Sequence, residues 1–146
     1  MSRVFVSAAT GAVIYVFADD HCPPHGHARH RGEDWVARVG FSYASNAVQL
    51  ISIAPLKNIP RQRVVNELLE DIHTRLAECR RSWWTIRQTS CLANQWVTML
   101  AAGKIAFCRE RTPDAKQIAG AEYDPTSDRL HVTILDGTTI EVSAEL

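Results

Sequence analysis

Apolar and polar residues alternate in short runs over the first part of the chain, and turn residues separate these runs. Residues 4–7 and 12–18 are rich in Val, Ile, Tyr and Phe, with Thr10-Gly11 between them. This pattern predicts an opening β-hairpin. Further strands are expected at residues 25–30, 35–41 and 47–53.

The period of the pattern changes from residue 60 onward. Apolar side chains then recur at helical spacing, at Val65, Leu68, Leu69, Ile72, Leu76 and Trp83. The spacing predicts one long amphipathic helix over residues 60–84, with Asn58 as its N-cap and Pro60 in its first turn. A shorter helix is expected over residues 90–103.

The remaining segments are predicted as strands. These are residues 104–109, 119–123, 129–135 and 138–143, with Asp136-Gly137 as a tight hairpin turn. The expected fold class is α+β, with an antiparallel sheet packed against one long amphipathic helix and a C-terminal three-strand segment. Residues 1–88 form the expected main domain, and residues 89–146 a smaller part packed on it as one unit.

Composition and length fit a single globular body. The chain has 146 residues, of which 46% are hydrophobic and 22% charged, and this length suffices to bury a core. Its longest apolar runs, residues 12–18 and 47–56, are too short to span a bilayer. The N-terminus lacks the basic segment and apolar core of a secretion signal, so a cytoplasmic location is expected and no membrane partner.

The zero net charge conceals an uneven distribution. Residues 117–146 carry six acids and one base, Arg129, so the preceding residues have an excess of five positive charges. A basic body favours an anionic partner, and an acidic tail could screen it. An uneven split of this size also arises by chance.

Four cysteines occur, and no pair has the spacing of a zinc ribbon or a redox motif. Without a secretion signal they are expected to be reduced and mostly buried.

Residues 19–31 concentrate the chemistry of the chain. This stretch holds four of the six histidines, two carboxylates, a thiol and two arginines around Pro23-Pro24. In an extended strand, His25 and His27 point to the same side and can bind one divalent ion. His21 is the expected third ligand, and Asp20 or Cys22 is a fourth ligand or a hydrogen-bond partner of a ligand.

Three interpretations of these residues remain open. Three ligands with an open position let a metal such as zinc or manganese activate water for hydrolysis. Without a metal, Asp20 and the three histidines could act as acid and base, while a phosphate is held by Arg29, Arg31, Arg61 and Arg63. Alternatively, the stretch only stabilises a loop or lines an interface. For His73 and His131 a structural role is favoured.

The motif Asp20-His21-x-Pro23-Pro24-His25-x-His27, directly after an apolar strand, resembles an uncharacterised bacterial family, domain-of-unknown-function family 4160. The resemblance covers residues 1–85, although Gly26 stands where that family usually has Phe. Residues 121–124, Arg129-Leu130 and Asp136-Gly137 resemble the start of domain-of-unknown-function family 2442. Members of both families are commonly suggested to be toxin–antitoxin-like, which implies such a setting here.

Three classes of function follow from these observations. The first is a hydrolytic enzyme, for which a metal-assisted nuclease of a toxin–antitoxin or phage-defence system is the leading hypothesis. The second is a non-enzymatic protein that binds nucleic acid or a protein partner and could form oligomers. The third is a metal-binding module without turnover. Trp83-Trp84 is the best aromatic candidate for a partner surface.

Overall fold

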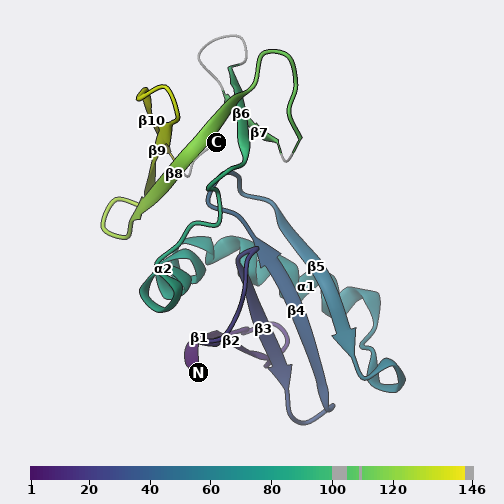
Figure 1. Ribbon diagram of the computed structural model, residues 1–146. Coiled ribbons are helices and arrows are strands. Elements are labelled where there is room, and N and C mark those ends of the chain that lie inside the picture. Colours follow the sequence, from purple (N-terminus) through teal and green to yellow (C-terminus); the bar gives the residue numbers. More distant parts are fainter. Residues whose placement is uncertain (100–104, 109, 144–146) are drawn as a thin grey trace.

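In the part of the chain that the structure describes, the protein contains two antiparallel sheets, two short α-helices and one short 3-10 helix (Figure 1). The computed structural model describes residues 1–99, 105–108 and 110–143. The first sheet has the strand order β1-β2-β3-β4-β5, in which each strand pairs with the next one along the chain. Its strands are β1 (Ser2–Val6), β2 (Val13–Val16), β3 (His25–His30), β4 (Trp35–Phe41) and β5 (Val48–Ala54). All five were expected from the alternation.

The second sheet has the strand order β10-β9-β8-β6-β7. Its strands are β6 (Trp96–Met99), β7 (Ile105–Cys108), β8 (Lys116–Asp124), β9 (Arg129–Ile134) and β10 (Thr139–Ser143). The turn at Asp136-Gly137 lies between β9 and β10, and Gly137 has a φ of 89°, a conformation that favours glycine. The expected C-terminal strands are therefore confirmed. The acidic segment is not a loose tail, because it supplies three strands of this sheet.

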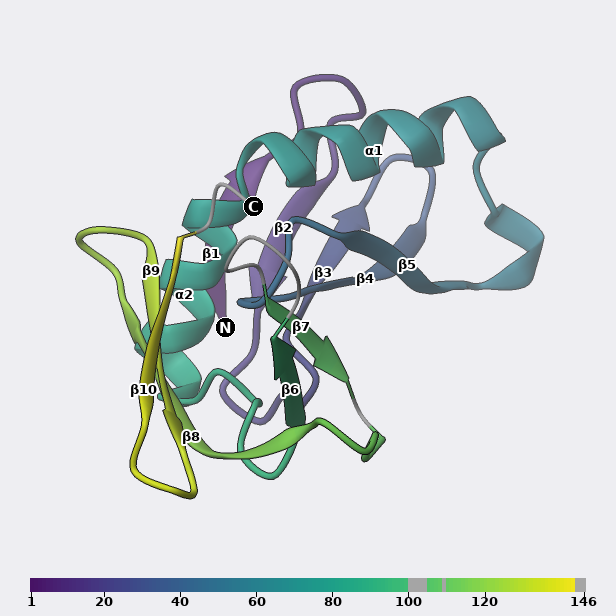
Figure 2. The ribbon, with the colours of Figure 1, turned by 90° about the horizontal axis from the view of Figure 1, so that it is seen from above.

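The expected fold class is wrong, because the described residues are mostly β and contain no single long helix packed against a sheet. After the short 3-10 helix η1 (Leu56–Asn58), the predicted helix is divided into α1 (Gln62–Thr74) and α2 (Leu76–Arg87). Figure 2 shows the chain turning sharply between the two helices. No helix in the described part of the chain is long and apolar enough to cross a membrane.

Two local features accompany the break between the helices. The Thr74 hydroxyl donates to the Glu70 carbonyl, a contact that bends helices. Arg75 then leaves helical geometry, with φ of −113° and ψ of 30°. Ile72 and Leu76 are nevertheless both buried. The apolar spacing therefore continues through the break, and the sequence alone cannot reveal it.

Two smaller predictions are also wrong. The N-cap of α1 is Arg61, without a side-chain cap, while Asn58 donates a hydrogen bond to the Asp34 carbonyl. The helix expected over residues 90–103 is replaced by a loop and β6, which pairs with β7 and β8. Residues 100–103 lie outside the described part. Trp96, Val97 and Thr98 are residue types that favour strands.

One hydrophobic cluster contains residues of both sheets and both helices. Helix α2 lies between the sheets (Figure 1), and its Trp84 ring packs against Tyr123 of β8. Buried Arg80 of α2 bonds to Ser42 and Ser45 on one side and to Asp128 on the other. Trp83 is fully buried, so it belongs to the core rather than to a partner surface. The expected division at residue 88 stays a prediction.

Candidate metal centre

The connection between β2 and β3 carries the candidate site, and a carboxylate shapes it. The backbone N–H of Asp20 donates to the Phe17 carbonyl at 3.1 Å, and Asp20 Oδ2 accepts the Phe17 N–H at 2.8 Å. These two bonds close a tight turn directly after β2. The other carboxylate oxygen, Oδ1, then faces the first residues of β3.

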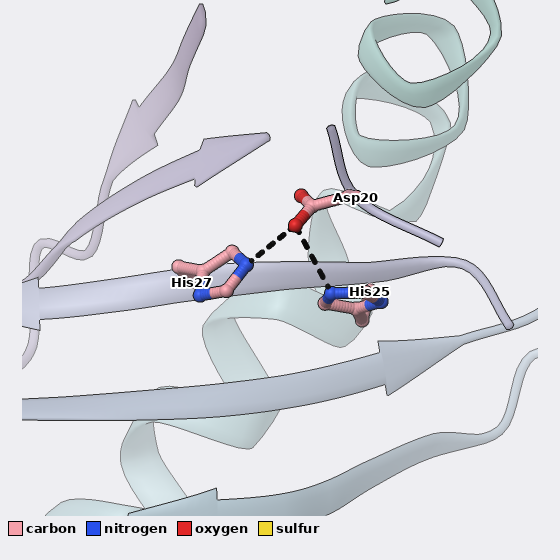
Figure 3. Close-up of side chains that lie close together, drawn as sticks. All are labelled: Asp20, His25 and His27. Carbon is pink, nitrogen blue, oxygen red and sulfur yellow. Dashed lines mark hydrogen bonds and ion pairs between the residues drawn. The ribbon is translucent and has the colours of Figure 1, made fainter. Parts of the chain in front are cut away.

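His25 and His27 lie two residues apart on β3, so both side chains reach the same face of the strand. Figure 3 shows both imidazoles turned toward Asp20. Asp20 Oδ1 is 3.0 Å from Nε2 of His27 and 3.4 Å from Nε2 of His25. Asp20 and His25 are buried, with 8% and 2% of their surface exposed, and His27 is half-buried. The predicted convergence of the two histidines is thus present.

Hydrogen bonding determines which ring nitrogen of His25 is available to bind a metal ion. Nδ1 of His25 is 2.8 Å from the Pro23 carbonyl, which can only accept, so Nδ1 carries the hydrogen. In the neutral ring, the lone pair is then on Nε2 and points toward the Asp20 carboxylate. Two electron-rich atoms facing each other at a buried position favour a cation between them. A backbone carbonyl that orients a histidine in this way is a usual partner in metal sites.

Aromatic packing holds the two imidazoles in place. The His25 ring lies 5.5 Å from the buried ring of Trp83, and 5.1 Å from the ring of His27. Phe17 contacts His27 edge to face, with ring centroids 4.7 Å apart. Little rotamer freedom therefore remains to be lost when a ligand binds.

Asp20 is held in its ionised form. Burial raises the pKa of this carboxyl, but the Phe17 N–H bond and the interactions with His27 and His25 outweigh it. The pKa of Asp20 therefore lies below its ordinary value of 3.8. The carboxylate is available as an anionic ligand near neutral pH.

The donor spacing fits a metal ion. The three donor atoms of Asp20, His25 and His27 all lie within 4.8 Å of one another. Ligands at zinc bond lengths of about 2.05 Å in a tetrahedron are about 3.3 Å apart. The separations of 3.0 and 3.4 Å from Oδ1 bracket this value. The cluster could hold a divalent ion with little movement.

Two of the expected ligands do not join this cluster. His21 is exposed, and its Nδ1 donates to the adjacent Cys22 carbonyl at 3.0 Å. Its ring centroid is 5.8 Å from that of His25. Cys22 forms a disulfide with Cys91, so it offers no thiolate, and the expectation that all four cysteines are reduced is wrong. Cys79 and Cys108 are free thiols.

The four candidate arginines lie toward the end of the sheet where β3 finishes, and their role in anion binding stays a prediction. Arg29 is exposed on β3, and Arg31 is exposed in the turn after it. Arg61 and Arg63 lie at the start of α1. This helix begins at the end of the sheet where β3 finishes. His25, which pairs with Gly40, lies at the opposite end. Arg63 is also paired with Glu67 at 3.2 Å. The expected phosphate clamp from the helix start is therefore remote from the histidines.

A cavity of about 680 Å³ lies beside the site, between β5 and β7. His21, His25 and Arg38 contribute to its wall, together with apolar residues such as Phe41, Leu50 and Phe107. The alternation of apolar and polar residues alone did not identify Arg38 as a candidate site residue. Arg38 lies directly opposite His27 in the β3–β4 pairing, and knowledge of that register would have identified it as one.

Comparison of the chain with family models, with curated proteins and with solved structures found no match. The two family resemblances therefore stay predictions. Gly26 bears on the first of them, because a Cβ added there would lie 3.2 Å from Cγ2 of Ile14. The Phe usual at this position in that family would require the core to shift.

Proposed function

We propose that the protein binds a divalent metal ion through Asp20, His25 and His27 and uses it to hydrolyse its substrate. The observation that supports this most directly is the convergence of the three donor atoms. The hydrogen of His25 is on Nδ1, so Nε2 can bind the ion. Two imidazoles with one carboxylate are a ligand set of catalytic zinc sites, which keep a position for water.

The chemistry at such a site follows from the coordination position of the metal that the three protein ligands leave open for water. A bound metal lowers the pKa of its water toward neutrality and polarises the bond to be cleaved. Zinc and manganese are the proposed ions, because imidazole suits zinc and carboxylate oxygen also suits manganese. No other cofactor is proposed. The cavity beside His25 gives a substrate space next to the centre.

A non-enzymatic binding protein is the second candidate. It is favoured by the Asp20 contacts to Phe17 and His27, which form a hydrogen-bonded group without any ion. In that case the cluster stabilises the β2–β3 connection, and the protein acts through its surface on nucleic acid, on a protein or on a second copy. The toxin–antitoxin or phage-defence setting rests on the resemblances and stays a prediction.

The cytoplasmic location also stays a prediction. The disulfide between Cys22 and Cys91 is more typical of oxidising compartments, or of proteins that respond to redox conditions.

Metal content tests the proposal directly. Protein purified without a histidine tag and dialysed against zinc or manganese should bind one ion per chain, measured by plasma mass spectrometry. His25→Ala and His27→Ala should lose the ion, while the exposed His73→Ala and His131→Ala should keep it. The bound protein should also cleave an activated phosphodiester faster than His25→Ala does. Equal metal content in all five proteins, or no metal in any, contradicts the proposal.

A further inference from the structure

The strand pairing of the first sheet aligns a row of residues across its outer face. Arg3 of β1 lies opposite Tyr15 of β2, Tyr15 opposite His27 of β3, and His27 opposite Arg38 of β4. Arg38 in turn lies opposite Ser52 of β5. Residues directly opposite each other in an antiparallel pair project to the same face. The row therefore passes through His27, a proposed metal ligand.

The helices cover the other face of this sheet. The neighbouring positions Ile14, Ala28 and Ala37 pair with one another and are buried in the core cluster with Leu68 and Ile72 of α1. In Figure 1, α1 passes behind β4 and β5. The face that carries His27 is the one opposite α1, and α2 reaches it at the His25 end through Trp83.

A second row on the same face is also accessible. Val6, Val13, Arg29, Val36 and Ala54 are successive partners across the five strands. Val6 and Val36 are each 37% exposed. This row therefore leaves the second set of side chains on the face accessible to a partner.

The exposed charges of the paired strand residues on this face have one sign, while the ionised Asp20 carboxylate is buried against His27 and His25. Arg3, Arg29 and Arg38 are exposed, and none of them has an ion-pair or hydrogen-bond partner in the described part of the chain. The paired strand residues on this face include no Asp or Glu. Because arginine binds phosphate in a bidentate way, three unpaired guanidinium groups favour a polyanion over a neutral or basic partner.

Aromatic rings lie between these charges. Tyr15 and Phe17 are half-buried, with their ring centroids 6.4 Å apart, and Phe17 contacts the His27 ring. Half-buried rings on a basic sheet are how several domains stack the bases of single strands, while arginines hold the phosphates. The row from Arg3 to Arg38 crosses three strand spacings, about 14 Å. That length suits two or three bases.

We propose that the outer face of the first sheet binds a single-stranded nucleic acid along the row from Arg3 through Tyr15 and His27 to Arg38. Bases stack on Tyr15 and Phe17, and the arginines contact phosphates. The inference rests on the proposed function in that it names the substrate of the same centre, because the strand passes over His27. Arg38 also lines the cavity, so a base at that end can enter it.

Fluorescence anisotropy with labelled twelve-nucleotide strands tests the surface. RNA, DNA and a duplex of the same sequence are titrated in EDTA, so that binding is measured independently of any metal. We expect the single strands to bind more tightly than the duplex, with log K falling against log salt at a slope near −2 for three phosphate contacts. Binding of either single strand supports the proposal, and the affinity ratio tells which polymer is preferred.

Variants locate the binding on this face. Arg3→Gln, Arg38→Gln and Tyr15→Leu should each lower the affinity about tenfold, which corresponds to loss of one stacking or phosphate contact. Tyr15→Phe should retain it, which separates lost stacking from misfolding. Arg63→Gln, at the remote start of α1, is the matched control and should bind as the wild type does.

Three results would overturn the inference: preference for the duplex, equal effects of Arg63→Gln and Arg38→Gln, or displacement of the strand by equimolar polyglutamate. Each is independent of metal content, because EDTA is present throughout. A protein that binds zinc but no strand keeps the proposed function and loses the surface. A protein that binds a single strand but no zinc keeps the inferred binding surface and loses the proposed function.

Discussion

Cys22 is disulfide-bonded to Cys91, which is 69 positions further along the chain. Cys22 lies between Asp20 and His25, and Cys91 lies between α2 and β6 on the wall of the cavity. The bond therefore joins the connection that carries the candidate metal ligands to the segment that begins the second sheet. Stability and metal affinity should both depend on it.

Removal of the disulfide should destabilise the protein. In the chain-entropy description, a cross-link that closes a loop of this length contributes about 4 kcal/mol, because it restricts the unfolded chain. We expect the Cys22→Ser/Cys91→Ser double variant to lose a free energy of unfolding of this order in urea titrations, and to bind zinc more weakly. Cys108→Ser is the control and should change neither. Retention of full stability by the double variant would show that the bond does not constrain the fold.

Thiol labelling should distinguish the two free cysteines. Burial raises the pKa of the Cys79 thiol to about 12, and the side chain is only 2% exposed. Since the thiolate is the reactive form, Cys79 should resist iodoacetamide in the native state. Half-buried Cys108 should be alkylated first, as peptide mass spectrometry would show. Alkylation of Cys22 or Cys91 without reductant would contradict the pairing.

Arg80 should be among the most sensitive positions of the fold. Its guanidinium is buried and donates to the carbonyls of Ser42 and Ser45, and it pairs with Asp128 at 3.4 Å. Arg80→Met would remove the donor to two carbonyls and one of the two donors to the Asp128 carboxylate, which also accepts from the Tyr123 hydroxyl. We expect a loss of about 3 kcal/mol in unfolding free energy. Exposed Arg81→Met is the control on the same helix, and an equal loss there would count against the contact.

The sequence predicted the strands well, because their patterns are local. The alternation in residues 35–41 and the Asp136-Gly137 turn each define an element without reference to the rest of the chain. The convergence of His25 and His27 followed from the same two-residue period. As a metal ligand, Asp20 was one of two alternatives beside Cys22, since its place as a ligand depends on the turn it forms with Phe17.

What failed did not follow from the pattern of apolar and polar residues. The break at Arg75 leaves the apolar period intact, so that pattern does not mark it. The bond from Cys22 to Cys91 and the pairing of His27 with Arg38 join residues whose relation exists only in the folded sheet. His21 was predicted as a ligand because it is close in sequence, yet its side chain turns to the Cys22 carbonyl.

The C-terminal hairpin should lose stability in acid through one carboxyl group. Hydrogen bonds from the hydroxyl and the N–H of Thr138, together with Lys116, lower the pKa of Asp136 from 3.8 to about 2. A lowered folded-state pKa gives stability that is present above pH 3.8 and lost as the pH falls through about 2. Asp136→Asn should therefore be less stable than the wild type at neutral pH and nearly equal to it near pH 2.

Denaturant titrations of both proteins at several pH values measure this difference. Asp114→Asn, at an exposed position between β7 and β8, is the control and should show no such convergence. A stability gap for Asp136→Asn that stays constant down to pH 2 would show that the hydrogen bonds do not depend on ionisation.

Metal binding should raise the thermal stability of the native protein only. The unfolded chain cannot hold Asp20, His25 and His27 together, so zinc stabilises the folded state by mass action. At a zinc concentration one hundred times Kd, the gain is about 2.7 kcal/mol, which for a chain of this length raises Tm by about 10 °C. Asp20→Asn should retain the fold but show a much smaller shift, because the amide offers a neutral oxygen in place of an anionic ligand, and His131→Ala should shift as the wild type does. If zinc raises Tm equally in all three, the ion binds elsewhere on the protein and the proposed centre is wrong.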